Sequence, residues 1–179
     1  MELIGSFSLL LALCLCAYAV AAALLSVRTE RPLLLQSAER ATLVVNALIV
    51  VATACLVALL LTDQFRVASV AQHSNRALPV YYKFAALWSG QEGSLLWWSC
   101  LLSTYAMLAV RLNRRAHRHL MPYVIAAVMG VQLFFLLLNN FAANPFQLLA
   151  FAEQGRWQVF TIGRDGRSPA AEVVGRRRF

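Results

Sequence analysis

The sequence predicts an all-α, polytopic membrane protein with about four transmembrane helices and a short amphipathic segment on its outer face. Hydrophobic residues make up 60% of the chain and charged residues only 13%, whereas a soluble domain is about half apolar and about a quarter charged. The apolar residues are also gathered into uncharged runs, long enough as helices to cross a hydrocarbon core of about 30 Å. The two observations together exclude a soluble globular domain.

Four uncharged runs are the expected transmembrane helices. They cover residues 5–27, 41–62, 94–110 and 121–141. Only Glu2 precedes the first run as a charged residue, and Arg28 and Arg31 follow it, which is the reverse of the charge order in a cleaved secretory signal. The first run is therefore expected to stay in the protein as a membrane anchor.

Two of these runs have features that bear on packing. The run 41–62 holds one strongly polar side chain, Asn46, which needs a partner from a neighbouring helix or from the interface. The run 94–110 is short for a span and is expected to extend back toward Trp88. Helices are the form expected for all four runs, because the strands of an outer-membrane barrel alternate apolar and polar residues over about ten positions.

Basic residues in the connections predict the orientation, because Lys and Arg near helix ends gather on the cytoplasmic side. One side carries Arg28, Arg31, Arg40, Arg111, Arg114, Arg115 and Arg118. The other side carries fewer within reach of a helix end, namely Arg66, Arg76, Lys83 and Arg156. We therefore expect both termini and residues 63–93 on the outer side, on a count that leaves out the tail arginines far from the bilayer.

The formal net charge of +8 does not indicate nucleic-acid binding. The basic residues lie between and after the apolar runs, and no contiguous basic face with interleaved aromatic residues precedes the tail. All four cysteines, Cys14, Cys16, Cys55 and Cys100, fall inside apolar runs, where cysteine usually acts as a small hydrophobic residue. Metal or disulfide chemistry is therefore disfavoured.

The connection of residues 63–93 holds most of the functional signal. In its second half, apolar residues recur at a spacing of three to four, which predicts a short amphipathic segment in the interfacial zone. Its aromatic rings, Tyr82 and Trp88 among them, also fit an ordinary interface belt. The polar turn that follows supplies Gly90 and Gly93 for a tight turn or a close backbone approach.

The end of this turn predicts the start of the third helix. Ser94 is the expected N-cap. Glu92 then lies near the helix N-terminus, where the helix dipole favours an acid. The same carboxylate could instead pair with Lys83 or with a polar ligand group, and spacing alone leaves both roles open.

Several segments of the sequence occur in order in one known family. They are Glu2–Phe7, His73–Arg76, Leu78–Pro79, Tyr82–Lys83, Leu87–Trp98 and Asn144–Phe146. Through them the sequence resembles the CcmF/NrfE family of cytochrome c biogenesis proteins, the haem lyase subunits, over roughly residues 2–148. It departs from the family at Ser89, where glycine is usual, and at Gln91, where many members have histidine.

The resemblance implies a large multi-pass protein of the bacterial inner membrane, with the N-terminus and residues 63–93 in the periplasm. Such a protein accepts haem from a chaperone and helps attach it to apocytochrome c, together with other membrane subunits of cytochrome c maturation. The candidate contacts to haem or to a partner are Tyr82, Lys83, Trp88, Gln91, Glu92 and Trp98. Because the family's haem ligands lie downstream of the matched part, this chain alone is expected not to bind haem.

Residues 149–179 depart from the family pattern. This Arg-rich tail has little periodic pattern, so we expect it to be disordered or outside the family reading frame, while residues 1–148 form the transmembrane region. The hypothesis that follows is a truncated or frameshifted member of the family.

The histidines show no ligand pattern that the family would use. His117 and His119 lie in the Arg-rich turn, and their spacing does not place them on one helix face. His73 lies in the outer connection. The sequence also lacks a catalytic constellation, a P-loop and paired membrane carboxylates, so the assignment as a subunit of a haem lyase complex comes from the resemblance only.

A small membrane transporter or channel subunit is the alternative function. Charged residues within the spans would favour transport, and the runs 5–27, 41–62 and 94–110 have none. A membrane enzyme would need a polar cluster that these runs lack. The residues alone therefore indicate a four-span membrane protein with an organised outer connection, and the assembly role comes from the resemblance.

Overall fold

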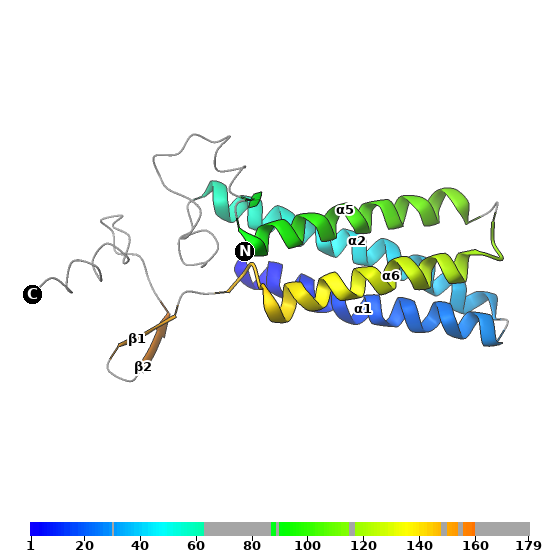
Figure 1. The fold of residues 1–179 in the computed structure, drawn as a ribbon, viewed down its shortest axis with the longest axis horizontal. Coiled ribbons are helices and arrows are strands. Elements are labelled where there is room, and N and C mark those ends of the chain that lie inside the picture. The colour runs from blue at the N-terminus through cyan, green and yellow to red at the C-terminus, as the bar shows by residue number, and fades with distance from the viewer. Residues whose placement is uncertain are drawn as a thin grey trace, which may run out of the picture.

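Four long helices form an antiparallel bundle in the computed structural model, which describes residues 1–29, 31–62, 87–88, 90–114, 117–147, 150–153 and 156–159 (Figure 1). They are α1 (Glu2–Thr29), α2 (Pro32–Leu61), α5 (Gln91–Asn113) and α6 (Met121–Leu137). A π-helix, η1 (Leu138–Ala142), continues α6. Each of α1, α2, α5 and the continuous α6–η1 helix is long and apolar enough to cross a membrane.

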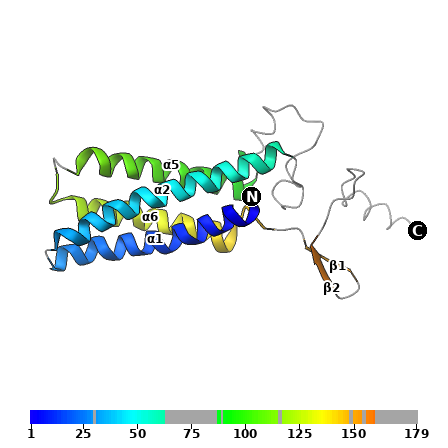
Figure 2. The same cartoon turned by 180° about the vertical axis from the view of Figure 1, so that it is seen from behind.

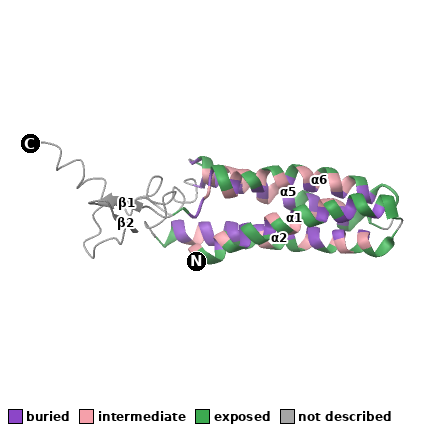
Figure 3. Ribbon diagram, turned by 90° about the horizontal axis from the view of Figure 1, so that it is seen from below, coloured by how far each residue is buried: buried purple, intermediate pink, exposed green. Residues whose placement is uncertain are grey.

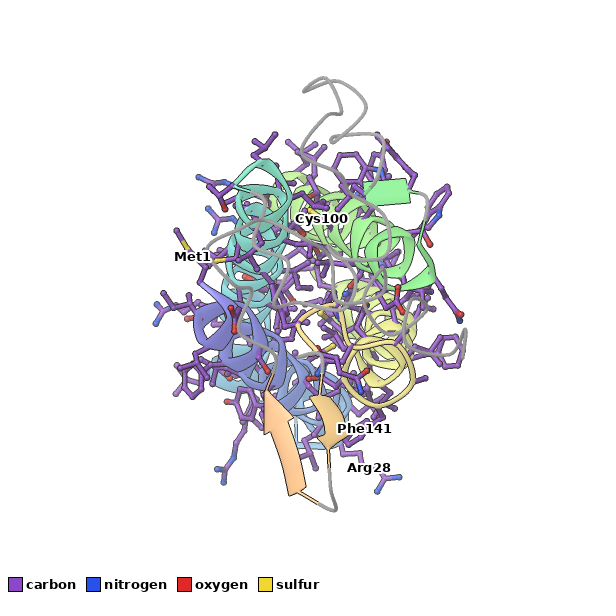
Figure 4. The ribbon with its side chains drawn as sticks, turned by 90° about the vertical axis from the view of Figure 1, so that its left-hand side faces the viewer. Met1, Arg28, Cys100 and Phe141 are labelled. Atoms are coloured by element: carbon purple, nitrogen blue, oxygen red, sulfur yellow. The ribbon has the colours of Figure 1, made fainter. Side chains whose placement is uncertain are left out.

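The two ends of the bundle are different in kind. At the Met1 end, α1 begins, α2 ends, α5 begins and η1 ends; at the Arg28 end, α1 ends, α2 begins, α5 ends and α6 begins (Figures 1 and 2). Figure 4 shows the four helices end-on from the Met1 end. The short connections that hold most of the predicted cytoplasmic arginines therefore lie together at the Arg28 end.

The prediction of four spanning helices is confirmed, and each helix is longer than its uncharged run. The second helix begins at Pro32, before Glu39 and Arg40, whose charged groups lie one to two turns from its end. Pro32 fits this start because its fixed φ suits the first helical position. The third helix begins at Gln91, so the polar turn supplies the extra length that the run 94–110 needs.

Small residues bring α1 close to its neighbours. The buried face of α1 consists mainly of alanine, with Ala12, Ala19 and Ala23 fully buried beside Cys16. Small side chains allow helix backbones to approach closely, which favours packing inside a membrane where lipid supplies no hydrophobic driving force between helices. Large apolar side chains instead lie exposed on the outside of the bundle, including Leu10, Leu24, Val44, Val51, Tyr105 and Phe134. Figure 3 shows that exposed positions recur along the helices.

Side-chain amides join the helices across the interior. The Nδ2 group of Asn46 on α2 donates to Ser103 Oγ and to Thr104 Oγ1 of α5, each at 3.1 Å. Gln132 Nε2 on α6 donates to Ser99 Oγ of α5 at 2.6 Å, and both residues are fully buried. The expectation that Asn46 finds a partner on a neighbouring helix is confirmed.

The end of the last helix is tied to the helices on both sides of it. Asn139 Nδ2 donates to the carbonyl of Phe135 at 3.0 Å and lies 3.5 Å from the carbonyl of Leu95 on α5. Asn140 Nδ2 lies 3.4 Å from the carbonyl of Leu9 on α1. A π-turn frees carbonyls from the regular ladder, and these amides hold the turn against α5 and α1.

Two short strands lie in the segment for which the sequence predicts no regular structure. They are β1 (Ala150–Glu153) and β2 (Arg156–Val159), paired antiparallel with Ala150 opposite Val159 and Glu153 opposite Arg156. In the sequence, a glycine at position 155 separates the two stretches, which is a pattern typical of hairpins, and the Arg-rich composition of the whole tail obscures it. The hairpin is therefore a feature that the sequence analysis missed.

Replacing Asn46 by leucine is expected to weaken the α2–α5 contact. The variant loses two interhelical hydrogen bonds, and such bonds inside membranes contribute about 0.6–1.7 kcal/mol, so the free energy of unfolding should fall by about 1 kcal/mol. Unfolding of the purified chain by a denaturing detergent measures this change. Thr53→Val is the matched control, because that hydroxyl donates only to the Ile49 carbonyl of its own helix; an equal loss in both variants would contradict the interhelical role of Asn46.

Candidate functional site

The polar turn before α5 lies at the Met1 end and is anchored by a buried leucine. Leu87 is 1% exposed, and Gly90, also buried, is the N-cap of α5 with an extended backbone at φ −104° and ψ 152°. The backbone N–H of Ser94 donates to the Gly90 carbonyl at 3.1 Å, which closes the first helical turn. The turn is therefore continuous with the helix that follows it.

The prediction that Ser94 is the N-cap is wrong. Gly90 occupies that position without a side-chain cap, and Ser94 Oγ donates to the Gln91 carbonyl at 3.0 Å from inside the helix. The helix extends to Gln91 because its first turn accepts polar residues, and Glu92 there is favoured by the helix dipole. The uncharged run marked the apolar part of the helix and not its start.

Gly93 makes the close backbone approach that the sequence predicts. A Cβ atom at this position would overlap the carbonyl oxygen of Leu87. That oxygen belongs to the backbone, so it cannot move aside as the end of a flexible side chain would. Glycine at 93 therefore lets the segment at Leu87 pack directly on the first turn of α5.

Two tryptophans meet across this turn. The rings of Trp88 and Trp97 have centroids 5.3 Å apart and an interplanar angle of 66°, an edge-to-face contact. Trp97 packs on the core, while Trp88 keeps 46% of its surface exposed. Trp98, the next residue, is 59% exposed, so the two adjacent tryptophans point to different sides of α5.

A second contact at the Met1 end joins distant parts of the chain. Phe146, which is 5% exposed, packs with its ring over Gly5 at the start of α1, in the space that a Cβ would fill. The N–H of Phe146 donates to Asn144 Oδ1 at 2.9 Å, which shapes the segment after η1. Two of the segments that carry the family resemblance, near each end of the matched part, are therefore in contact.

Known proteins are similar to this chain in sequence and in fold, although no family model matches. The cytochrome c-type biogenesis protein CcmF of Pseudomonas fluorescens is 33% identical over 143 residues, which is 80% of this chain and 22% of that protein. The cytochrome c-type biogenesis protein NrfE of Haemophilus influenzae is 34% identical over 84 residues, 47% of this chain and 13% of that protein. A solved structure named cytochrome c haem lyase CcmF has a TM-score of 0.76 and 27% identity, over 82% of this chain and 24% of that one.

This chain belongs to the CcmF/NrfE family. It spans about a fifth of the length of the CcmF of Pseudomonas fluorescens, so the comparison concerns a four-helix part of that fold. The same bundle arrangement is present in the solved CcmF.

The structure brings together some of the predicted site residues of this CcmF/NrfE member. Trp88, Gln91 and Glu92 lie in or beside the turn, with Gln91 exposed and Glu92 half-buried, and Trp98 lies on the outward face of the same helix. Tyr82, Lys83, the amphipathic segment and His73 lie outside the described residues. The predicted pairing of Glu92 with Lys83 is therefore still a prediction.

Trp97 is not among the residues predicted to contact haem or a partner, and the structure places it against Trp88. It is the edge-to-face partner of Trp88 and lies four positions after Gly93, on the same face of α5. The spacing was the available signal in the sequence. A residue one helical turn after Gly93 lies on the same face of the helix and therefore faces the same segment that packs on Gly93. Packing on Trp97 holds Trp88 in place at the Met1 end.

The described part of the turn fits contact with a flat apolar ligand better than ligation of iron. Haem iron in proteins is held by His, Cys, Met or Tyr, whereas the turn from Leu87 to Ser94 offers a tryptophan face, an amide and a carboxylate among its described residues. His117 and His119 lie at the Arg28 end, between α5 and α6. Within the described ranges, no group of three or more potential metal ligands occurs.

Replacing Gly93 by alanine is expected to destabilise the turn. The added methyl meets the Leu87 carbonyl, and overpacking of this kind costs about 1–3 kcal/mol. Denaturing-detergent unfolding of the purified chain measures the loss. Gly130→Ala is the matched control, since nothing lies within 4 Å of a Cβ at that position, and a neutral Gly93→Ala would show that the turn does not pack on Gly93.

Proposed function

We propose that this chain acts in cytochrome c maturation as a membrane component that assists haem delivery and attachment to apocytochrome c. The family supports this role, because its members are named cytochrome c-type biogenesis proteins and the similar solved structure is a cytochrome c haem lyase. The observation that carries the proposal is the Trp88–Trp97 turn, built against Gly93 at the Met1 end. Its partners are a haem chaperone, apocytochrome c and other maturation subunits of the membrane.

The tryptophan pair supplies contact area and not iron ligation in this proposal. Trp97 fixes the ring of Trp88, so an exposed aromatic surface is preorganised at low entropic cost for a porphyrin face or a partner protein. Gln91 offers an exposed amide beside it, and Glu92 offers a carboxylate in the first helical turn. Both polar groups suit orienting contacts to a ligand or partner, as do Tyr82, Lys83 and Trp98 from their positions in the sequence.

The proposed location is the bacterial inner membrane, with the Arg28 end in the cytoplasm and the Met1 end in the periplasm. Arginines at the Arg28 end support this orientation, since bases near helix ends are retained on the cytoplasmic side. Attachment of haem to apocytochrome c then occurs on the side where the Trp88 turn lies.

The interior of the bundle favours an assembly role over transport. Charged side chains inside a span mark substrate or ion pathways. The buried polar residues of the described helices are all uncharged, and they include Asn46, Ser99, Ser103, Gln132 and Asn139. The amides of Asn46 and Gln132 donate to a neighbouring helix, and the amide of Asn139 donates to a carbonyl of its own helix, as structural contacts do.

Loss of the exposed tryptophan should lower cytochrome c maturation. Deleting the gene in its host should reduce covalently bound haem in c-type cytochromes, and a plasmid copy should restore it. A Trp88→Ala copy should restore at least about fivefold less covalently bound haem than the unchanged copy, because truncating an aromatic contact costs about 1–2 kcal/mol or more. Haem staining of membrane proteins after gel electrophoresis measures the yield.

Tyr105→Ala is the matched control for this experiment, since Tyr105 is an aromatic residue of α5, the helix that follows the Trp88 turn, and is 68% exposed. It should restore maturation fully at equal protein level. If deletion of the gene leaves the yield of c-type cytochromes unchanged, the proposed function is wrong. If deletion lowers the yield but the Trp88→Ala copy restores it fully, the role of the tryptophan pair is wrong.

The orientation can be tested by labelling cysteines placed at the two ends. Gln147→Cys at the Met1 end should react with a membrane-impermeant maleimide on intact spheroplasts, whereas His119→Cys at the Arg28 end should react only after lysis. Both residues are exposed in the structure. A background with Cys14, Cys16, Cys55 and Cys100 replaced by alanine supplies the control, and the opposite labelling pattern would reverse the proposed topology.

A further inference from the structure

A cavity of about 450 Å³ opens at the Arg28 end, between α2 and α5. Among the described residues, its lining comes from two segments that are far apart in sequence, one on α2 and one that runs from the end of α5 into the connection to α6. The residues are Gln36, Glu39, Arg40 and Leu43 of α2, Val110 and Arg111 of α5, and Arg114 and Arg118 from the connection that leads to α6. The proposed function makes no use of this end of the bundle.

The cavity is strongly basic. Four guanidinium groups and one carboxylate line it. In the part of the chain that the structure describes, none of the four arginines takes part in an ion pair. Like charges gathered in one place repel each other, so an anion in the cavity would stabilise the arrangement.

Setting the membrane orientation does not require this convergence. Basic residues anywhere in the connections satisfy the charge rule, and Arg28 and Arg31 do so outside the cavity. The planar guanidinium group presents a fork of N–H donors that binds phosphate oxygens in pairs. The arginines of these two segments, which face one cavity, therefore point to a phosphate-bearing ligand.

The floor of the cavity is apolar. Val110 is 4% exposed and Leu43 is half-buried, and each lies on the membrane side of a charged neighbour, Arg111 and Glu39 respectively. The polarity of the cavity thus changes from basic at the helix ends to apolar toward the bilayer. A free phosphate or nucleotide has no part that matches this floor, whereas a phospholipid has the same gradient.

A second, apolar cavity of about 420 Å³ continues along the same pair of helices. It is lined by Val50, Thr53, Ala54, Val57, Ala58 and Leu61 of α2 and by Trp97 and Cys100 of α5. Figure 4 shows Cys100 between these two helices, and α2 and α5 lie side by side in both side views (Figures 1 and 2).

Helical periodicity places the two cavities along the same faces of α2 and α5. The surface between them, called here the α2–α5 groove, passes the level where Asn46 bonds Ser103 and Thr104. Leu43 lines the basic cavity and Val50 the apolar one, and they are seven positions apart, close to two turns or about 10 Å on one face of α2. On α5, Arg111 and Trp97 are fourteen positions apart, or about four turns on one face. An acyl chain that starts at the basic cavity is long enough to follow this groove.

We propose that the basic cavity binds the phosphate headgroup of an anionic phospholipid, whose acyl chain lies in the α2–α5 groove. The arginines hold the phosphate at the depth where helix ends meet the headgroup layer, and Leu43 and Val110 contact the start of the chain. Basic pockets between membrane helices are suited to such headgroups. The bound lipid would join α2 to α5 at the end of the bundle opposite the Trp88 turn.

Native mass spectrometry of the full chain in detergent tests this proposal. The chain is titrated with phosphatidylglycerol, with cardiolipin and with phosphatidylcholine. We expect one anionic lipid bound with about tenfold or greater preference over phosphatidylcholine, because phosphatidylcholine carries the same phosphate together with a quaternary ammonium, whose positive charge the arginines repel. Equal retention of the three lipids would overturn the proposal.

Two double variants with the same loss of charge separate a site from a general surface effect. Arg111→Gln with Arg114→Gln should bring the preference within about twofold of phosphatidylcholine, whereas Arg28→Gln with Arg31→Gln, at the same end but outside the cavity, should keep most of it. All four residues are exposed, so each variant should fold. Equal losses in both pairs would overturn the site.

Two further arms test the chemistry of the ligand. Arg111→Lys with Arg114→Lys keeps the charge but removes the paired donors, so it should weaken binding less than the glutamine pair and more than the Arg28 pair. Inorganic phosphate added in excess should leave the lipid bound. If phosphate displaces the lipid, the cavity binds a free anion and the assignment to a phospholipid is wrong.

Discussion

Hydrogen bonding of polar groups in a medium without water is the constraint on which the structure depends. In hydrocarbon every backbone N–H and C=O needs a partner inside the protein, and a helix supplies it locally. The four long helices follow from this requirement. Side-chain N–H groups inside the bundle obey it as well, since Asn46 and Gln132 each donate to hydroxyl groups of α5. Among the described residues, the buried side-chain oxygens of Gln132 and Asn139 accept no hydrogen bond.

The same constraint determines how the ends of the bundle are built. At the Met1 end, where helices stop, Asn139 and Asn140 hold the π-turn against Leu95 and Leu9, and Phe146 covers Gly5. The Trp88 turn is fixed there by a backbone contact, because only the missing side chain of Gly93 leaves room for the Leu87 carbonyl. A rigid end of this kind can present an exposed aromatic ring in one position.

The two ends differ in chemistry as well as in structure. The Met1 end presents aromatic rings with an amide and a carboxylate, while the Arg28 end gathers guanidinium groups around a cavity. Aromatic surface suits a flat apolar ligand or a partner protein, and guanidinium groups suit phosphate. A four-helix part of a CcmF/NrfE protein thus carries a different surface at each end of its bundle.

The sequence by itself determined the class of fold, the four spans and the family. Uncharged runs of sufficient length can only be helices in lipid, so these features do not depend on which residues become neighbours. Tertiary structure alone decided that α5 begins at Gln91 and not at Ser94, that Trp97 holds Trp88, and that Arg40 of α2 shares one cavity with arginines at the end of α5. Those features depend on contacts between residues far apart in the chain, and such contacts form only when the helices pack.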